Sequence, residues 1–93
     1  ILAAAGAAPV VTKASADAFQ DTDLAQHLEG VDDLAICGMM TQNCVVFTAM
    51  SRAADGYRVR VVGDLCTAPS EIVHRIALNA LGSKLSVVAA AEL

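Results

Sequence analysis

The chain has 93 residues and a formal net charge of −4, and 56% of its residues are hydrophobic. That length suits one small domain or part of a larger one. Aromatic residues make up only 3% of the chain and Trp is absent, so the core must consist of aliphatic side chains. No basic patch stands out, and no apolar run approaches the length of a bilayer span. Nucleic acid and membranes are therefore not expected as partners.

The amino-terminal stretch, ILAAAGAAPVV, has no initiating Met and lacks the positive region that precedes the apolar part of a signal peptide. We interpret it as an internal segment of a longer protein. Three cysteines, Cys37, Cys44 and Cys66, show no CxxC spacing. An odd number of thiols in a chain with few cysteines is typical of a reducing compartment, which predicts a cytoplasmic location.

Short β-branched runs alternate with helical patterns along the chain. Strands are predicted over residues 9–13, 33–38, 58–64 and 84–90, and helices over residues 22–30, 43–56 and 70–82. Thr22 is the expected N-cap of the first helix, and Gly30 and Gly56 are the expected stops of the first two helices.

The order β-α-β-α-β-α-β, with mostly apolar strands, predicts an α/β fold with a parallel sheet and crossover helices. We find no internal repeat, low-complexity tract or linker, so residues 1–93 are interpreted as one domain. In such sheets functional side chains gather at the carboxyl ends of the strands. Lys13 and the segments 39–44 and 64–67 follow three of the predicted strands, so the sequence points to that rim.

Cys44 falls in the first turn of the predicted helix over 43–56. Free backbone N–H groups and the positive end of the helix dipole favour an anion there, and a thiolate is such an anion. Residues 39–43 could also direct N–H groups toward a developing oxyanion, and Lys13 could supply a cation. On position alone, however, a buried and inert cysteine is the more common outcome.

For the remaining candidate residues, the sequence favours structural roles. Cys37 lies inside an apolar strand, and Cys66 has no evident activating neighbour. His27 and His74 fall on polar helix faces, where solvated histidines are expected, and they show no metal-ligand spacing. For Asp64 a capping or turn role is favoured over catalysis. No metal site or cofactor is predicted, because neither a P-loop nor a GxGxxG pattern is present.

Four stretches resemble the isochorismatase-like cysteine hydrolases, a family that includes nicotinamidases and N-carbamoylsarcosine amidohydrolases. In the family's order they are VVTKASADAFQDTDL, VDDLAICGMMTQNCVVFTAMSRAADGYRVRVVGD, DLCTAPSEIVHRIALNAL and SVVAAAEL. The second contains the family's Gly-x-x-Thr-x-x-Cys-Val signature, and the first supplies the upstream Lys. The likeness covers residues 9–93, nearly the whole chain.

The resemblance implies a role for each matching position. Cys44 would be the nucleophile and Lys13 the cation of the catalytic triad. The backbone N–H groups of Met40 and Cys44 would form the oxyanion hole, and the peptide bond between Met39 and Met40 would be cis. The residues implied to bind substrate are Phe19 and Thr41.

The same resemblance implies a three-layer, Rossmann-like sheet with helices on both faces. The family's strand order is 3-2-1-4-5-6, and this chain would hold strands 3, 4, 5 and 6. The aspartate that completes the triad has no match here, so we expect the chain to be the carboxyl-terminal half of a domain. Without the missing amino-terminal half it is predicted to be poorly stable and inactive. Relatives commonly assemble, so a homo-oligomer is expected.

The favoured function is a cysteine-dependent hydrolase that cleaves the C–N bond of a small amide without a cofactor. Two alternatives stay open. One is a non-catalytic oligomerisation or scaffold piece of the same fold. The other is a thiol redox module built on Cys44, with Cys37 or Cys66 as a partner brought near by the fold. The resemblance does not separate an amide from an isochorismate-type vinyl ether as the substrate.

Overall fold

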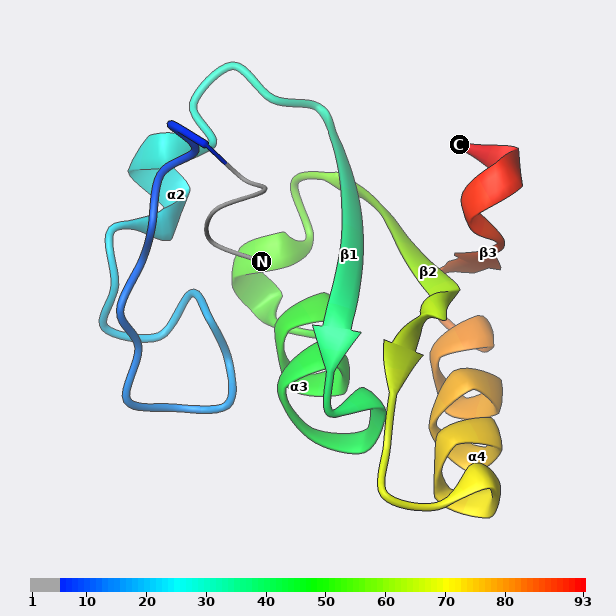
Figure 1. Ribbon diagram of the computed structural model, residues 1–93. Helices are drawn as coiled ribbons and strands as arrows, with labels where there is room; N and C mark the ends of the chain where they lie inside the picture. The colour runs from blue at the N-terminus through cyan, green and yellow to red at the C-terminus, as the bar shows by residue number, and fades with distance from the viewer. Residues whose placement is uncertain (1–5) are drawn as a thin grey trace.

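A three-stranded parallel sheet lies at the centre of the computed structural model, which describes residues 6–93 (Figure 1). The strands, in spatial order, are β1 (Asp33–Met39), β2 (Arg58–Thr67) and β3 (Ser86–Val88). This confirms the predicted α/β class with a parallel sheet. The interpretation of the amino-terminal stretch falls mainly on residues 1–5, which lie outside the described residues.

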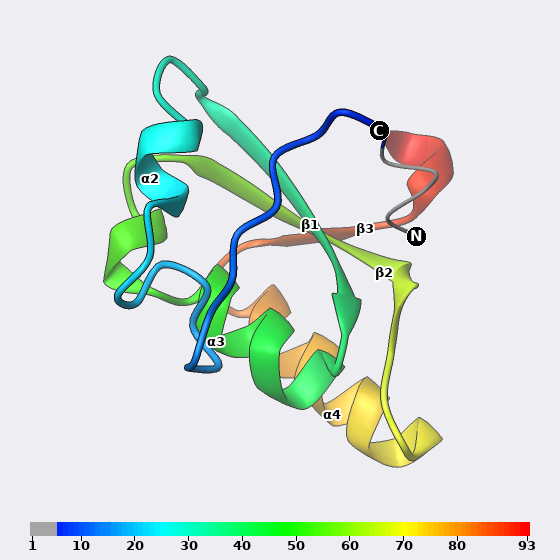
Figure 2. The ribbon, with the colours of Figure 1, turned by 60° about the vertical axis from the view of Figure 1, so that its left-hand side comes forward.

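Helices connect the strands as crossovers. The α-helices are α2 (Leu24–His27), α3 (Val46–Ala49) and α4 (Glu71–Gly82). Shorter helical turns are η1 (Thr41–Val45), η2 (Arg52–Ala54) and η3 (Ala90–Glu92). Figure 2 shows α3 and α4 beneath the same face of the sheet.

The hydrophobic core forms where these two helices meet that face. Val45 and Ala49 come from η1 and α3, Val61 from β2, and Leu81 from α4, and these side chains form one buried cluster. Val61 and Leu81 have no exposed surface. The core is therefore aliphatic, as the composition requires.

The predicted strand over 9–13 is wrong. Residues 9–13 adopt no regular structure, and neither pairing of the sheet includes them. In Figure 1 this blue segment lies apart from β1. A β-branched run becomes a strand only where its backbone pairs and its side chains find a surface to cover. Val10 is 68% exposed, so this run has found none.

The predicted helix over 43–56 is divided into three short pieces, η1, α3 and η2. It begins at Thr41, after Met40 in an extended conformation, and it breaks at Ser51, which is also extended. The Ser51 hydroxyl accepts a hydrogen bond from the Ala53 N–H at 3.2 Å and so starts η2. A serine that bonds nearby backbone competes with helix continuation, which explains the break.

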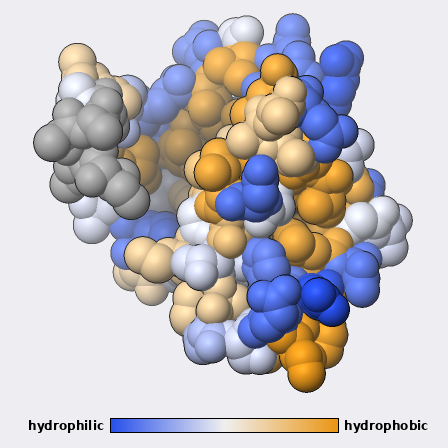
Figure 3. Space-filling model, turned by 45° about the vertical axis from the view of Figure 1, so that its right-hand side comes forward, coloured by the Kyte–Doolittle hydropathy of each residue, from blue (hydrophilic) through white to orange (hydrophobic). Residues whose placement is uncertain are grey.

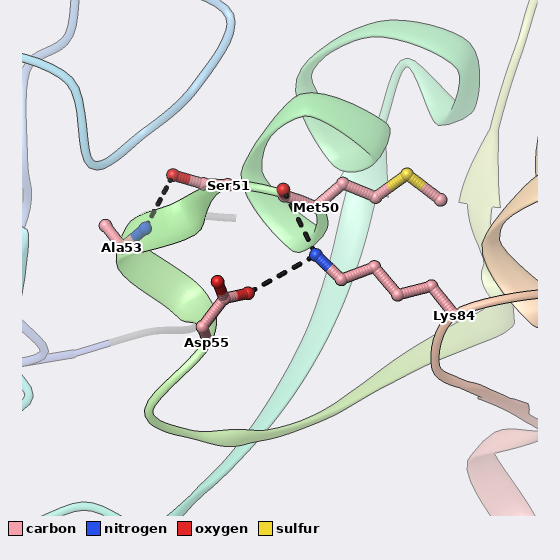
Figure 4. A network of polar contacts seen from close by, with 5 residues as sticks. All are labelled: Met50, Ser51, Ala53, Asp55 and Lys84. Carbon is pink, nitrogen blue, oxygen red and sulfur yellow. Dashed lines mark hydrogen bonds and ion pairs between the residues drawn. The ribbon is translucent and has the colours of Figure 1, made fainter.

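Lys84 holds the end of α3 to the segment that leads into β3 (Figure 4). Its Nζ donates to the Met50 carbonyl at 3.4 Å and to Asp55 Oδ1 at 3.3 Å. A cation at the carboxyl end of a helix satisfies free carbonyl groups there. The broken helix is thereby fastened from a position 34 residues away.

The other elements differ from prediction mainly at their ends. The helix expected over 22–30 is only four residues long, and its N-cap is Asp23 rather than Thr22. The expected stop Gly30 has a φ of 82°, whereas Gly56 does not have a positive φ. α4 begins as predicted, because the hydroxyl of the N-cap Ser70 accepts from the Val73 N–H. β2 extends three residues further than predicted, and β3 is shorter.

The face brought forward in Figure 3 carries apolar side chains among charged ones. Ile72 and Ile76 on α4 are 68% and 63% exposed. Within residues 6–93, no helix combines the length and apolar character needed to cross a bilayer.

Candidate active site

Lys13 and Cys44, 31 residues apart in the chain, meet at the end of β1. Lys13 Nζ lies 3.1 Å from Cys44 Sγ and donates to it. The same Nζ donates to the Ser15 carbonyl at 2.9 Å, which fixes the direction of the lysine side chain. An ammonium group at hydrogen-bond distance stabilises the thiolate form of a cysteine.

A sharp turn after β1 presents Cys44. Gly38 has a φ of 124°, and the peptide bond between Met39 and Met40 is cis. The Met40 carbonyl then accepts hydrogen bonds from the N–H groups of Asn43, at 3.0 Å, and Val45, at 3.3 Å. These bonds close the turn that carries Cys44 in η1.

The N–H of Met40 belongs to the cis peptide bond, and the N–H of Cys44 belongs to η1. Among the backbone hydrogen bonds outside helices and strands within residues 6–93, none has the N–H of Met40 or of Cys44 as its donor. Backbone N–H groups of this kind can stabilise an oxyanion that forms on a substrate carbonyl. The arrangement thus brings a thiol and an ammonium group together at the turn after β1.

Thr48 attaches the Lys13 loop to α3. Its Oγ1 accepts from the Ala18 N–H at 2.9 Å and donates to the Ala16 carbonyl at 3.3 Å. The apolar stripe of Val46, Ala49, Met50 and Ala53 predicts that Thr48 lies on the polar side of its helix, yet Thr48 is only 9% exposed. The hydroxyl of this mid-helix threonine binds backbone groups of a distant segment, and helical periodicity alone does not reveal such partners.

A cavity of about 270 Å³ opens beside the thiol. The residues lining it are Lys13, Ala18, Ile36, Cys37, Gly38, Met39, Cys44, Val45 and Thr48. None of these residues carries a carboxylate, so the described part of this cavity holds no acidic group for proton transfer. Two larger hollows, of about 320 and 480 Å³, contain neither Lys13 nor Cys44.

The two residues expected to bind substrate do not lie at this cavity. The Phe19 ring stacks on Tyr57, with ring centroids 6.2 Å apart, and is not among the lining residues. Thr41 has no exposed surface, and its Oγ1 lies 2.8 Å from Nδ1 of His74 on α4. His74 was expected to be solvated. It is instead half-buried and hydrogen-bonded to Thr41.

The surroundings of Cys66 and Asp64 indicate structural roles for both residues. Burial raises the pKa of the Cys66 thiol. Nearby Cys37 and Asp64 raise this pKa further, while a hydrogen bond from the Gly38 backbone opposes them. Asp64 Oδ1 accepts from the Ala90 N–H at 2.9 Å, which is the capping role favoured by the sequence.

The other histidine, His27, lies beside an acidic residue. His27 is exposed and lies 3.3 Å from Asp23 in its own helix. In the part of the chain that the structure describes, no cluster of three or more His, Cys, Asp or Glu side chains is arranged to hold a metal ion.

Comparisons with known proteins place this site in a family. Residues 2–92 match the family model described as the isochorismatase domain. Streptothricin hydrolase from Streptomyces noursei is 33% identical over 94 residues, which cover 85% of this chain and 37% of that protein. The chain therefore belongs to the isochorismatase family.

Solved structures agree in fold. An isochorismatase-like hydrolase from Alkaliphilus metalliredigens superposes with a TM-score of 0.83 at 31% identity, covering 88% of this chain and 47% of that one. The nicotinamidase from Staphylococcus aureus gives a TM-score of 0.75 at 28% identity, covering 91% of this chain and 59% of that one. The chain spans about half, or less, of the length of the curated relatives it matches. The fold is thus that of isochorismatase-family hydrolases.

Proposed function

We propose that this chain carries the nucleophile and the cation of a cysteine-dependent hydrolase that cleaves the C–N bond of a small amide. The observation that carries the proposal is the 3.1 Å contact between Lys13 Nζ and Cys44 Sγ, made across 31 residues at the mouth of a cavity. A contact of this kind supports an activated thiolate rather than an inert core cysteine.

The proposed reaction has two stages. The Cys44 thiolate adds to the amide carbonyl carbon, and the carbonyl oxygen takes the negative charge. The N–H groups of Met40 and Cys44 bind that oxyanion. The C–N bond then breaks, the amine leaves with a proton, and a thioester remains on Cys44. Water hydrolyses the thioester and releases the acid and the free thiol.

The proton that the leaving amine takes requires a further acid–base group. Because no carboxylate lines the described cavity, we infer that this group comes from outside residues 6–93. The isolated 93-residue chain is accordingly proposed to be inactive and poorly stable. A cooperatively melting, monomeric preparation of this chain that turned over an amide would contradict that part.

The test uses the full-length gene product, with nicotinamide and small aliphatic amides as probes and ammonia release as the readout. Cys44→Ser should abolish turnover, and Lys13→Met, which keeps the apolar stem but removes the charge, should lower kcat about 100-fold. Cys66→Ser is the matched control and should retain turnover, since Cys66 lies outside the cavity lining. Ammonia release that persists in Cys44→Ser would rule out the proposed nucleophile.

A further inference from the structure

Within residues 6–93, one side-chain hydrogen bond joins the turn that carries Cys44 to the helix α4. Thr41, the first residue of η1, is completely buried, and its Oγ1 lies 2.8 Å from His74 Nδ1. The two residues are 33 positions apart in the chain. Thr41 directly follows Met40 and precedes Cys44 by three residues, so this bond holds the chain between Met40 and Cys44.

The rest of the turn has few other polar anchors. Its internal bonds run to the Met40 carbonyl, which belongs to the turn itself. The Gln42 side chain reaches only Met40 Sδ, at 3.8 Å, and its buried Oε1 has no partner within residues 6–93. The Thr41–His74 bond is therefore the polar contact that ties this turn to a long helix.

We propose that His74 is a positioning residue, which holds the turn through Thr41 so that Cys44 stays beside Lys13. This inference rests on the proposed function for its catalytic consequence. His74 itself does not line the cavity.

The imidazole suits this task because either tautomer can make the bond. With the proton on Nε2, the Thr41 hydroxyl donates to Nδ1; with the proton on Nδ1, the ring donates to Oγ1. An asparagine amide offers both roles and places its polar atoms near the position of Nδ1. A glutamine amide reaches the position of Nε2 instead.

This difference provides a matched pair of variants, His74→Asn and His74→Gln, made in the full-length gene product. Glutamine is the better helix former of the two, so a role limited to the stability of α4 predicts that His74→Gln is the milder change. A positioning role predicts instead that His74→Asn is the milder change. Asn79→Ala, at an exposed site on the same helix, controls for the effect of any substitution in α4. It should behave as wild type.

Two readouts keep this inference separate from the proposed function. The first is the rate at which iodoacetamide alkylates Cys44 at pH 7.5, assigned by mass spectrometry, which needs no substrate. The second is kcat and KM for amide hydrolysis. For His74→Gln we expect a loss of about tenfold in kcat with little change in KM, and slower alkylation of Cys44. His74→Asn should recover most of both, although it is the less stable variant.

Each outcome decides one of the two claims. If alkylation follows the order wild type, His74→Asn, His74→Gln while no amide is hydrolysed, the positioning role stands and the proposed function fails. If Cys44→Ser abolishes turnover but the two His74 variants react equally, or His74→Gln is the faster, the positioning role is overturned and the proposed function stands.

Discussion

Replacing Thr48 by valine tests how the Lys13 loop is held in place. Valine has almost the same shape as threonine, so the packing against the core is kept while the hydroxyl is lost. Two hydrogen bonds disappear, one from the Ala18 N–H at 2.9 Å and one to the Ala16 carbonyl at 3.3 Å. Both backbone groups belong to half-buried residues and would be left without their partner.

The expected magnitude follows from those two bonds. A net hydrogen bond contributes about 1 kcal/mol to stability, and leaving a buried group unsatisfied costs about 1–3 kcal/mol. The loop attachment should therefore weaken by about 2 kcal/mol, since the groups are only partly buried. Equilibrium urea unfolding of the full-length gene product measures this loss. Thr48→Ser, which keeps Oγ, should lose clearly less.

The functional consequence is the separation of Lys13 from Cys44. We expect iodoacetamide to alkylate Cys44 several-fold more slowly in Thr48→Val, because Lys13 Nζ is no longer held 3.1 Å from Cys44 Sγ. In a Lys13→Met background the same substitution should have no further effect on that rate, because the partner is already gone. Equal rates for Thr48→Val and wild type, or additive losses in the double variant, would refute the reasoning.

Three further predictions concern the scaffold. Leu81→Ala should lower the free energy of unfolding by about 3 kcal/mol in urea titrations, because a fully buried side chain leaves a cavity; a loss below about 1 kcal/mol would contradict this. Gly38→Ala should cost about 1–2 kcal/mol and slow Cys44 alkylation, since its φ of 124° is strained for any side chain; wild-type behaviour would contradict it. Burial raises the pKa of Cys66, so the unfolded state ionises first as the pH rises. The contribution of this thiol to the free energy of unfolding is complete below the ordinary pKa range of thiols. It declines as the pH rises from that range through the raised pKa. Cys66→Ala should remove that decline; an unchanged slope of stability against pH would oppose it.

Sequence patterns predicted those elements whose stability is decided by burial. The apolar run that became β1 packs Ile36 against the core, and the amphipathic helix α4 buries Ala77 and Leu81, and their patterns gave nearly correct bounds. The pairing of Lys13 with Cys44 followed from the family resemblance, and the side chains do meet.

Features that depend on distant partners were not predictable in the same way. Residues 9–13 have the composition of a strand, but a strand needs a neighbour, and in the described residues they have none. Thr48 and His74 were placed on polar faces because helical periodicity does not reveal which polar groups find buried partners. The helix over 43–56 was broken by the Ser51 hydroxyl, a local competition that an apolar stripe does not register.

The most direct test of the central claim is to look for an acyl group on Cys44. The full-length gene product would be mixed with an amide probe that it hydrolyses, quenched in acid within the first turnover, and analysed by mass spectrometry of its peptides. The account predicts an acyl adduct confined to the peptide that contains Cys44, absent in Cys44→Ser and much reduced in Lys13→Met. Turnover without any adduct on Cys44, or an adduct on Cys37 or Cys66 in its place, would contradict it.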